Sequence, residues 1–189
     1  MRRQQGAAAP AAIPMVSGGV TVRRAHLVRF PSYRLTAQQG LELGLARYGA
    51  LNIFFFGRGQ KIALPWGEHW RLTAVARGSG LAAVLINQAR QRLAMAAAGA
   101  AAGNYGINGR DYAYTLNPAE GGWGRAHVWD LVAHEEPVAR FTRRPFDGHC
   151  DRPVPLPAVL LALTLTRFGI PGESDLHLPG MNWRLHGGG

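Results

Sequence analysis

The chain of 189 residues has one cysteine, Cys150, and one lysine, Lys61. A single cysteine excludes an internal disulfide and any Cys-x-x-Cys site, and it is consistent with a reducing compartment. Because Lys61 is the only lysine, 20 of the 21 basic residues are arginine. Together with abundant alanine and glycine, this bias indicates a GC-rich genome, which weakens the argument from basic charge to a nucleic-acid partner.

The sequence also lacks an apolar run that could span a membrane. The longest candidate, Leu156 to Ile170, has roughly 15 residues, and as a helix it would be about 22 Å long. The hydrocarbon core of a bilayer is ~30 Å thick. At the N-terminus, Pro10 and Pro14 interrupt the alanine-rich stretch, so we expect a flexible tail over residues 1–19 in preference to a secretory signal. An organelle transit peptide is the alternative.

Basic charge is plentiful but dispersed. The formal net charge is +10 and the isoelectric point is about 11.1, yet the arginines occur singly or in pairs such as Arg23-Arg24 and Arg143-Arg144. Runs of five or more basic residues, typical of nucleic-acid-binding tails, are missing. A solvated basic surface is therefore favoured over a nucleic-acid-binding protein, which is kept as an alternative.

The segment Leu156 to Phe168 predicts a helix that is apolar on all sides. Such a helix must be surrounded by protein or by lipid, and its length favours protein. Pro157 suits a first helical turn, Arg167 suits the last turn, and Gly169 and Pro171 form a stop signal. Thr164 and Thr166 can bond back to helix carbonyls and need not be exposed.

Most of the preceding sequence reads as short strands and turns. Trp70, Leu72, Ala74 and Ala76 alternate with polar residues, and Gly78-Ser79-Gly80 separates them from the apolar run Leu81 to Ile86, so a hairpin is expected. Asn108-Gly109 predicts a type I′ turn, with Tyr112, Tyr114 and Leu116 pointing inward on the strand that follows. The segment 88–103 is ambiguous between helix and strand, with a strand favoured at 92–96.

These elements predict a mainly β (α+β) fold. A helix without a polar face cannot lie on the outside of a sheet, so we expect a closed antiparallel β-barrel of roughly ten to twelve strands around the buried helix 156–168. The predicted divisions are a flexible tail at 1–19, the barrel at 20–170 and an irregular tail at 171–189.

This pattern resembles the tubby-like superfamily, which includes tubby C-terminal domains, phospholipid scramblases and LURP-one-related proteins. The resemblance covers about Tyr33 to Phe168. It rests on element order, on the strand Gly109-Arg110-Asp111-Tyr112-Ala113-Tyr114-Thr115-Leu116, and on the final helix that begins Pro155-Leu156-Pro157-Ala158-Val159-Leu160-Leu161.

The resemblance implies binding to phosphoinositide head groups through basic residues, as in tubby domains, or calcium-dependent action at membranes, as in scramblases. Scramblases carry an acidic segment before the buried helix, and Asp147 and Asp151 occupy the corresponding place. These are too few for a calcium loop, which needs six to eight oxygens. The cysteine-rich palmitoylation segment and a following membrane span are also missing, so scramblase activity is not expected.

Two sets of candidate site residues follow. Arg58, Lys61, Arg71 and Arg77 could form a basic face on neighbouring strands that binds an anionic ligand, the alternative being an ordinary hydrated surface. Asp147, His149 and Asp151 could bind a metal with a partner such as His127 or His134. Adjacent residues cannot all point to one ion, however, so a polar loop is favoured. A thiol nucleophile at Cys150 with His149 as its base is disfavoured for the same reason.

We therefore expect a non-enzymatic binding module without a cofactor, whose partner is an anionic phospholipid or a protein. Its expected location is the cytoplasm, with peripheral attachment to a membrane as an alternative. The other functional hypotheses are a structural or assembly component of a larger complex, and an enzyme that uses Asp147, His149 or Cys150.

Overall fold

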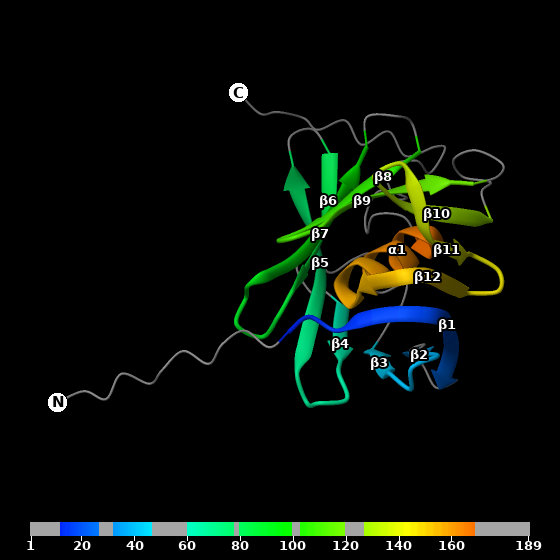
Figure 1. Ribbon diagram of the computed structural model, residues 1–189. Helices are drawn as coiled ribbons and strands as arrows, with labels where there is room; N and C mark the ends of the chain where they lie inside the picture. The colour runs from blue at the N-terminus through cyan, green and yellow to red at the C-terminus, as the bar shows by residue number, and fades with distance from the viewer. Residues whose placement is uncertain are drawn as a thin grey trace, which may run out of the picture.

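The computed structural model describes residues 12–26, 32–46, 60–77, 80–99, 103–119 and 127–168. In these ranges the chain forms twelve strands and one C-terminal helix (Figure 1). The strands are β1 (Met15–His26), β2 (Ser32–Ala37), β3 (Glu42–Ala46), β4 (Gln60–Ala63), β5 (His69–Arg77), β6 (Gly80–Ile86), β7 (Arg92–Ala98), β8 (Tyr105–Gly109), β9 (Ala113–Pro118), β10 (Val128–Ala133), β11 (Glu136–Thr142) and β12 (Asp147–Pro155), and the helix is α1 (Leu156–Phe168). The predicted mainly β fold with one C-terminal helix is confirmed.

Every strand pairs antiparallel with its neighbours, in the order β1-β12-β11-β10-β9-β8-β7-β6-β5-β4-β3-β2. The chain therefore advances around the sheet one hairpin at a time from β2 to β12. The first strand is the exception, since β1 pairs with β12 along one side and with β2 along the other. β1 begins at Met15, five residues before the predicted boundary at residue 20. The predicted tail at 171–189 lies outside the described residues.

The helix α1 forms the centre of the hydrophobic core. Every residue from Leu156 to Thr166 is buried, and α1 contacts β1, β6, β7, β8, β10, β11 and β12. Figure 1 shows α1, in orange, within the curve of the strands and behind β12. An apolar residue on any side of this helix therefore meets strand side chains, which explains why the sequence gives it no polar face.

The ends and polar residues of α1 are satisfied as the sequence predicts. The Leu156 N–H donates to the Pro14 carbonyl at 2.8 Å, while Pro157 has no N–H to leave unpaired. The buried hydroxyls of Thr164 and Thr166 donate to the carbonyls of Leu160 and Ala162 at 2.7 and 2.8 Å. At the other end, Arg167 donates to the Arg143 carbonyl at 3.0 Å.

The predicted type I′ turn at Asn108-Gly109 is wrong. Both residues belong to β8, Asn108 pairs with Ala113 in β9, and Arg110 and Asp111 form the turn. Gly109 serves close packing instead, because a Cβ at this position would collide with the Tyr112 ring. Tyr112 and Tyr114 do point inward and pack against the core, and Leu116 is fully buried.

Candidate functional site

The outer face of β5 carries an exposed arginine between two buried residues. Trp70 and Leu72 are buried in the core, and Arg71 between them is exposed. This is the expected result of the two-residue period of a strand. The predicted hairpin of residues 70–77 with 81–86 is confirmed, since β5 and β6 pair from Arg71 opposite Ile86 to Arg77 opposite Gly80.

The sheet register extends this position into a row across four strands. Lys61 of β4 is the partner of Arg71, and Arg71 is the partner of Ile86 in β6. Beyond a register shift between Leu85 and Ile86, Ile86 is the partner of the exposed Arg92 in β7. Partners on adjacent strands share a face of the sheet. Because adjacent strands are about 4.8 Å apart, the row spans about 14 Å. We call Lys61, Arg71 and Arg92 the basic row.

A fourth basic residue, Arg90, lies in the turn that joins β6 to β7. The turn is held by Asn87, whose N–H donates to the Gln91 carbonyl at 3.0 Å and whose side-chain oxygen accepts from the Gln91 N–H at 2.9 Å. Arg90 has a φ of 61°, which is uncommon for a residue other than glycine. The constrained turn places an exposed arginine two residues before Arg92.

The arginines near the row have no carboxylate partner among the described residues, unlike several arginines elsewhere. Arg34 lies 2.9 Å from Glu42, Arg140 lies 2.7 Å from Asp130, and Arg152 lies 2.6 Å from Glu136. In the described part of the chain, by contrast, no carboxylate bridges Arg71, Arg90 or Arg92. The result is uncompensated positive charge on this part of the surface.

The nearest acidic residue along the chain is already engaged. Residues 60–99 contain five basic side chains and one acidic side chain, Glu68. The Glu68 carboxylate accepts from the indole N–H of Trp66 and from that of Trp70, each at 3.1 Å. It therefore stabilises the β4–β5 turn.

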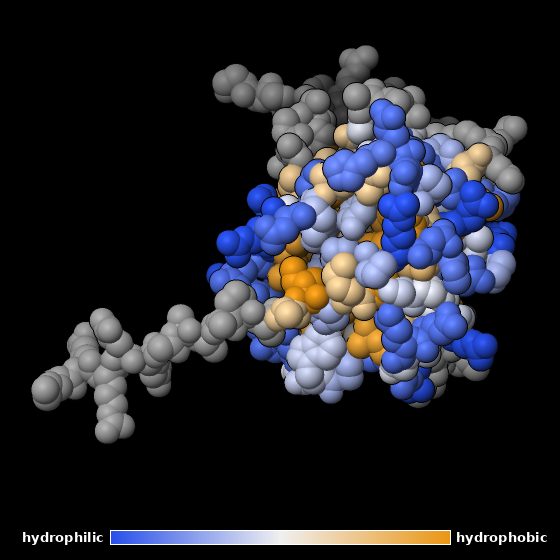
Figure 2. All heavy atoms as spheres, viewed as in Figure 1, coloured by the Kyte–Doolittle hydropathy of each residue, from blue (hydrophilic) through white to orange (hydrophobic). Residues whose placement is uncertain are grey.

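An exposed aromatic residue lies at the same end of the strands as the basic row. Trp66, in the β4–β5 turn, keeps 47% of its surface exposed. Since β4 to β7 are antiparallel, the β4–β5 and β6–β7 turns lie at the same end, as the teal and green loops in Figure 1 show. Figure 2 shows strongly hydrophilic residues over the β6–β7 turn, at the left of the view. Basic and aromatic groups are thus presented together.

The structure separates the four basic residues predicted from the sequence. Lys61 and Arg71 are brought together, whereas Arg77 lies at the opposite end of β5, about 20 Å away at 3.3 Å per residue. Arg58 lies outside the described residues. Arg90 and Arg92 were missed because the segment 88–103 could not be assigned firmly to a strand. Strand alternation would not have placed Arg92 correctly either, because Arg92 has the same parity as the buried Ala94 and Ala96 and is exposed only where the register shifts at the start of β7.

The predicted metal residues Asp147, His149 and Asp151 share the outer face of β12. The His149 Nε2 and an Asp151 carboxylate oxygen are 3.6 Å apart, and both side chains are exposed. The Asp147 carboxylate accepts from the Thr142 hydroxyl. Across the ranges that the structure describes, no three His, Cys, Asp or Glu side chains are grouped to hold a metal ion. The metal site stays a prediction without geometric support.

Cys150 and His149 lie on opposite faces of β12. Cys150 is buried against the core, and His149 is exposed. Burial raises the pKa of the Cys150 thiol to about 11, with a smaller contribution from Asp151. A thiol that stays protonated at neutral pH is a poor nucleophile, so the geometry gives no support to a Cys–His catalytic pair.

The chain matches no protein-family model, and neither the curated proteins nor the solved structures yield a match. Among the residues that the structure describes, no helix combines the length and apolarity needed to cross a membrane.

Proposed function

We propose that this chain is a non-enzymatic binding module of tubby-like architecture, and that the basic row recognises anionic phospholipid head groups. In this proposal the sheet closes into a barrel around α1, which is supported by the pairing of β1 with both β12 and β2. The observation that carries the functional proposal is the set of arginines without a carboxylate partner at Arg71, Arg90 and Arg92 within the described residues.

Three exposed arginines, Arg71, Arg90 and Arg92, lie at the same end of the sheet. Each basic residue near an anionic membrane contributes about 1 kcal/mol to binding, so the three arginines together would contribute roughly 3 kcal/mol.

Trp66 favours a membrane surface over a soluble anion. Tryptophan is enriched at membrane–water interfaces, where its apolar ring is buried and its indole N–H stays hydrogen-bonded. Trp66 is half exposed, and its N–H already donates to Glu68. The ring can therefore enter the head-group region without leaving its polar atom unpaired.

The test is binding to vesicles of phosphatidylcholine, with and without about 20% phosphatidylserine, in about 0.1 M salt. We expect binding only to the anionic vesicles. The double variant Arg71→Ala, Arg92→Ala should bind roughly thirty-fold more weakly, because two contributions of about 1 kcal/mol are lost.

The matched control is the double variant Arg110→Ala, Arg152→Ala, which lowers the net charge equally but on exposed arginines beside Asp111 and Glu136. It should change vesicle binding by less than about two-fold. Equal binding to both kinds of vesicle, or equal losses in the two double variants, would exclude the basic row as the recognition surface. An unaltered melting temperature verifies that the variants fold.

A further inference from the structure

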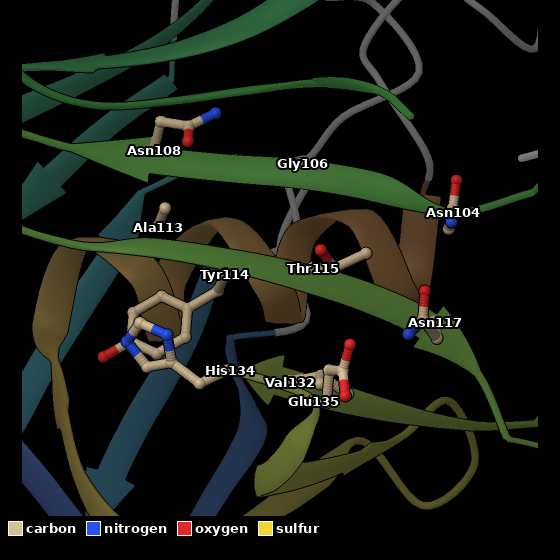
Figure 3. Close-up of a pocket in the computed structure, with 10 residues that line it drawn as sticks. All are labelled: Asn104, Gly106, Asn108, Ala113, Tyr114, Thr115, Asn117, Val132, His134 and Glu135. Atoms are coloured by element: carbon tan, nitrogen blue, oxygen red, sulfur yellow. The ribbon is translucent and has the colours of Figure 1, made fainter. Parts of the chain in front are cut away.

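A second surface feature lies on the outer face of β8, β9 and β10, away from the basic row. It is a groove of about 580 Å³. Figure 3 shows Tyr114 and His134 at one end of this groove and Asn104 and Asn117 at the other. The described residues that line it are Asn104, Gly106, Asn108, Ala113, Tyr114, Thr115, Asn117, Val132, His134 and Glu135.

The groove lies where the pairing of β9 with β10 stops, two residues short of the first residue of β9. The pairing of β9 with β10 extends only to Thr115 opposite Val132, whereas the pairing of β9 with β8 continues to Ala113 opposite Asn108. At this point β10 ends, and the two-residue turn His134-Glu135 leads into β11. Ala113 and Tyr114, the first two residues of β9, therefore have no partner in β10.

The turn that borders the groove has an unusual backbone. His134 and Glu135 have φ values of 49° and 68°, as required at the two central positions of a type I′ turn, where asparagine and glycine are preferred. Retaining a histidine and a glutamate in this conformation costs stability. Both side chains line the groove, which gives their retention a functional explanation.

On β8, a glycine provides the floor of the groove. Gly106 shares the outer face with Asn108, and a Cβ at Gly106 would contact only the Asn108 amide nitrogen, at 3.7 Å. The glycine is therefore not required by close packing or by a positive φ. At the far end, the Asn104 side chain is held against the backbone of Gly99, whose N–H donates to the Asn104 carbonyl at 2.8 Å.

The lining is polar and, among the described residues, contains no arginine or lysine, although the chain has 21 of them. Its only carboxylate is Glu135, which disfavours an anionic ligand. Asn108, Thr115 and Asn117 provide amide and hydroxyl groups that have no side-chain hydrogen-bond partner within the described ranges. Each amide offers both donors and acceptors.

We propose that this groove binds a neutral polyhydroxylated ligand, a saccharide, through Asn108, Thr115, Asn117 and Glu135. A sugar hydroxyl is both donor and acceptor, so adjacent hydroxyls match the paired donor and acceptor of an asparagine amide. Tyr114 packs partly against the core, and the part of its ring that lines the His134 end of the groove supplies an apolar surface for the C–H face of a sugar.

The test uses the full chain and an immobilised panel of neutral hexose and N-acetylhexosamine oligosaccharides, with solution titration of each that is retained. We expect at least one neutral member to bind, and Gly106→Val to weaken that binding about ten-fold or more by filling the groove. The double variant Asn108→Ala, Asn117→Ala should give a loss of similar size with the groove left open.

Two controls keep the outcome interpretable. Gly19→Val adds the same side chain to β1, where a Cβ would meet only the Gln38 side-chain oxygen at 3.8 Å, and it should leave saccharide binding unchanged. Arg71→Ala, Arg92→Ala should also leave it unchanged, so that a failure of either proposal is distinguishable from a failure of the other. If no neutral saccharide binds, or if Gly106→Val binds as the unaltered protein does, the groove is not a saccharide site.

Discussion

The outer surface formed by β4 to β7 differs in charge from the one formed by β8 to β12, although both consist of consecutive antiparallel hairpins. Residues 60–99, which form β4 to β7, contain five basic and one acidic residue. Residues 105–155, which form β8 to β12, contain six basic and seven acidic residues. The excess positive charge is therefore not spread evenly, as a bias toward arginine codons alone would produce. It lies in residues 1–99, which contain thirteen basic and two acidic residues and include the basic row.

The same two surfaces also differ in shape, and the extent of strand pairing is the cause. β5 and β6 stay in register from Arg71–Ile86 to Arg77–Gly80, which makes a continuous face suited to an extended partner such as a membrane. β9 continues past the end of β10, which leaves a hollow suited to a small molecule. Under the two proposals, these differences in charge and shape correspond to two different classes of ligand.

The inner faces of the two halves, in contrast, are equivalent. Leu72 and Leu85 in one half and Ile107 and Leu131 in the other are all buried in the core that surrounds α1. A change in the helix should therefore affect both surfaces, and a change on either outer face should affect only one.

The largest effect is expected for Leu161→Ala. Leu161 is completely buried in α1, and truncation of a buried leucine costs about 2–5 kcal/mol of unfolding free energy. A loss of about 3 kcal/mol would lower the melting temperature by roughly 6–12 °C. Below that temperature, both vesicle and saccharide binding should persist. If the folded variant lost only vesicle binding or only saccharide binding, the two surfaces would not depend equally on the core around α1.

Salt should separate the two surfaces next most clearly. Exposed charges are screened over about 10 Å at 0.1 M salt and over shorter distances as salt rises. Raising salt from about 0.1 to 0.5 M should weaken vesicle binding about ten-fold or more and saccharide binding less than about two-fold. Titrations of the same protein sample with both probes measure this, and parallel losses would show that charge does not distinguish the surfaces.

Much of the fold could be predicted because its signals are local. The all-round apolar character of residues 156–168 predicts α1 with its observed bounds, and the alternation at 70–77 predicts the face on which Arg71 lies. These patterns depend on helix and strand periodicity alone. Lys61 could be grouped with Arg71 because a hairpin joins their strands.

The remainder depends on register and strand ends, which periodicity does not encode. Asn108-Gly109 has the composition of a type I′ turn, but the left-handed turn is formed by His134-Glu135. The packing of Tyr112 against Gly109 explains why tertiary structure overrides this local preference. The groove was missed altogether, because it lies where the pairing of β9 with β10 stops two residues short of the pairing of β9 with β8.

Trp66→Ala should have a moderate effect confined to the basic surface. Removing a half-exposed indole at a membrane interface should weaken vesicle binding by roughly three- to five-fold, and it should leave saccharide binding unchanged. Vesicle co-sedimentation measures the first effect. Trp66→Phe, which keeps an aromatic ring, is the matched control and should recover most of the loss. Full binding by the alanine variant would mean that the surface recognises charge alone.

The smallest expected effect is a loss of stability at alkaline pH, caused by buried groups in the half of the sheet that contains the groove. Burial raises the pKa of Tyr112 and of Tyr114 above the ordinary value, and it raises the pKa of Cys150 to about 11. The unfolded chain therefore loses these protons at lower pH than the folded protein does.

A raised pKa in the folded state means that the associated stability is complete below the unfolded pKa and is lost as pH rises. For Cys150 that loss begins near pH 9 and continues to about pH 11. Between pH 8 and 10 we expect the melting temperature to fall by a few degrees, with about 2 °C of this removed in Cys150→Ala. Arginine keeps its charge throughout this range, so vesicle binding by the folded protein should be unchanged. If vesicle binding by the folded protein fell over the same pH range as the melting temperature, the basic row would depend on the ionisation of the buried groups in the other half.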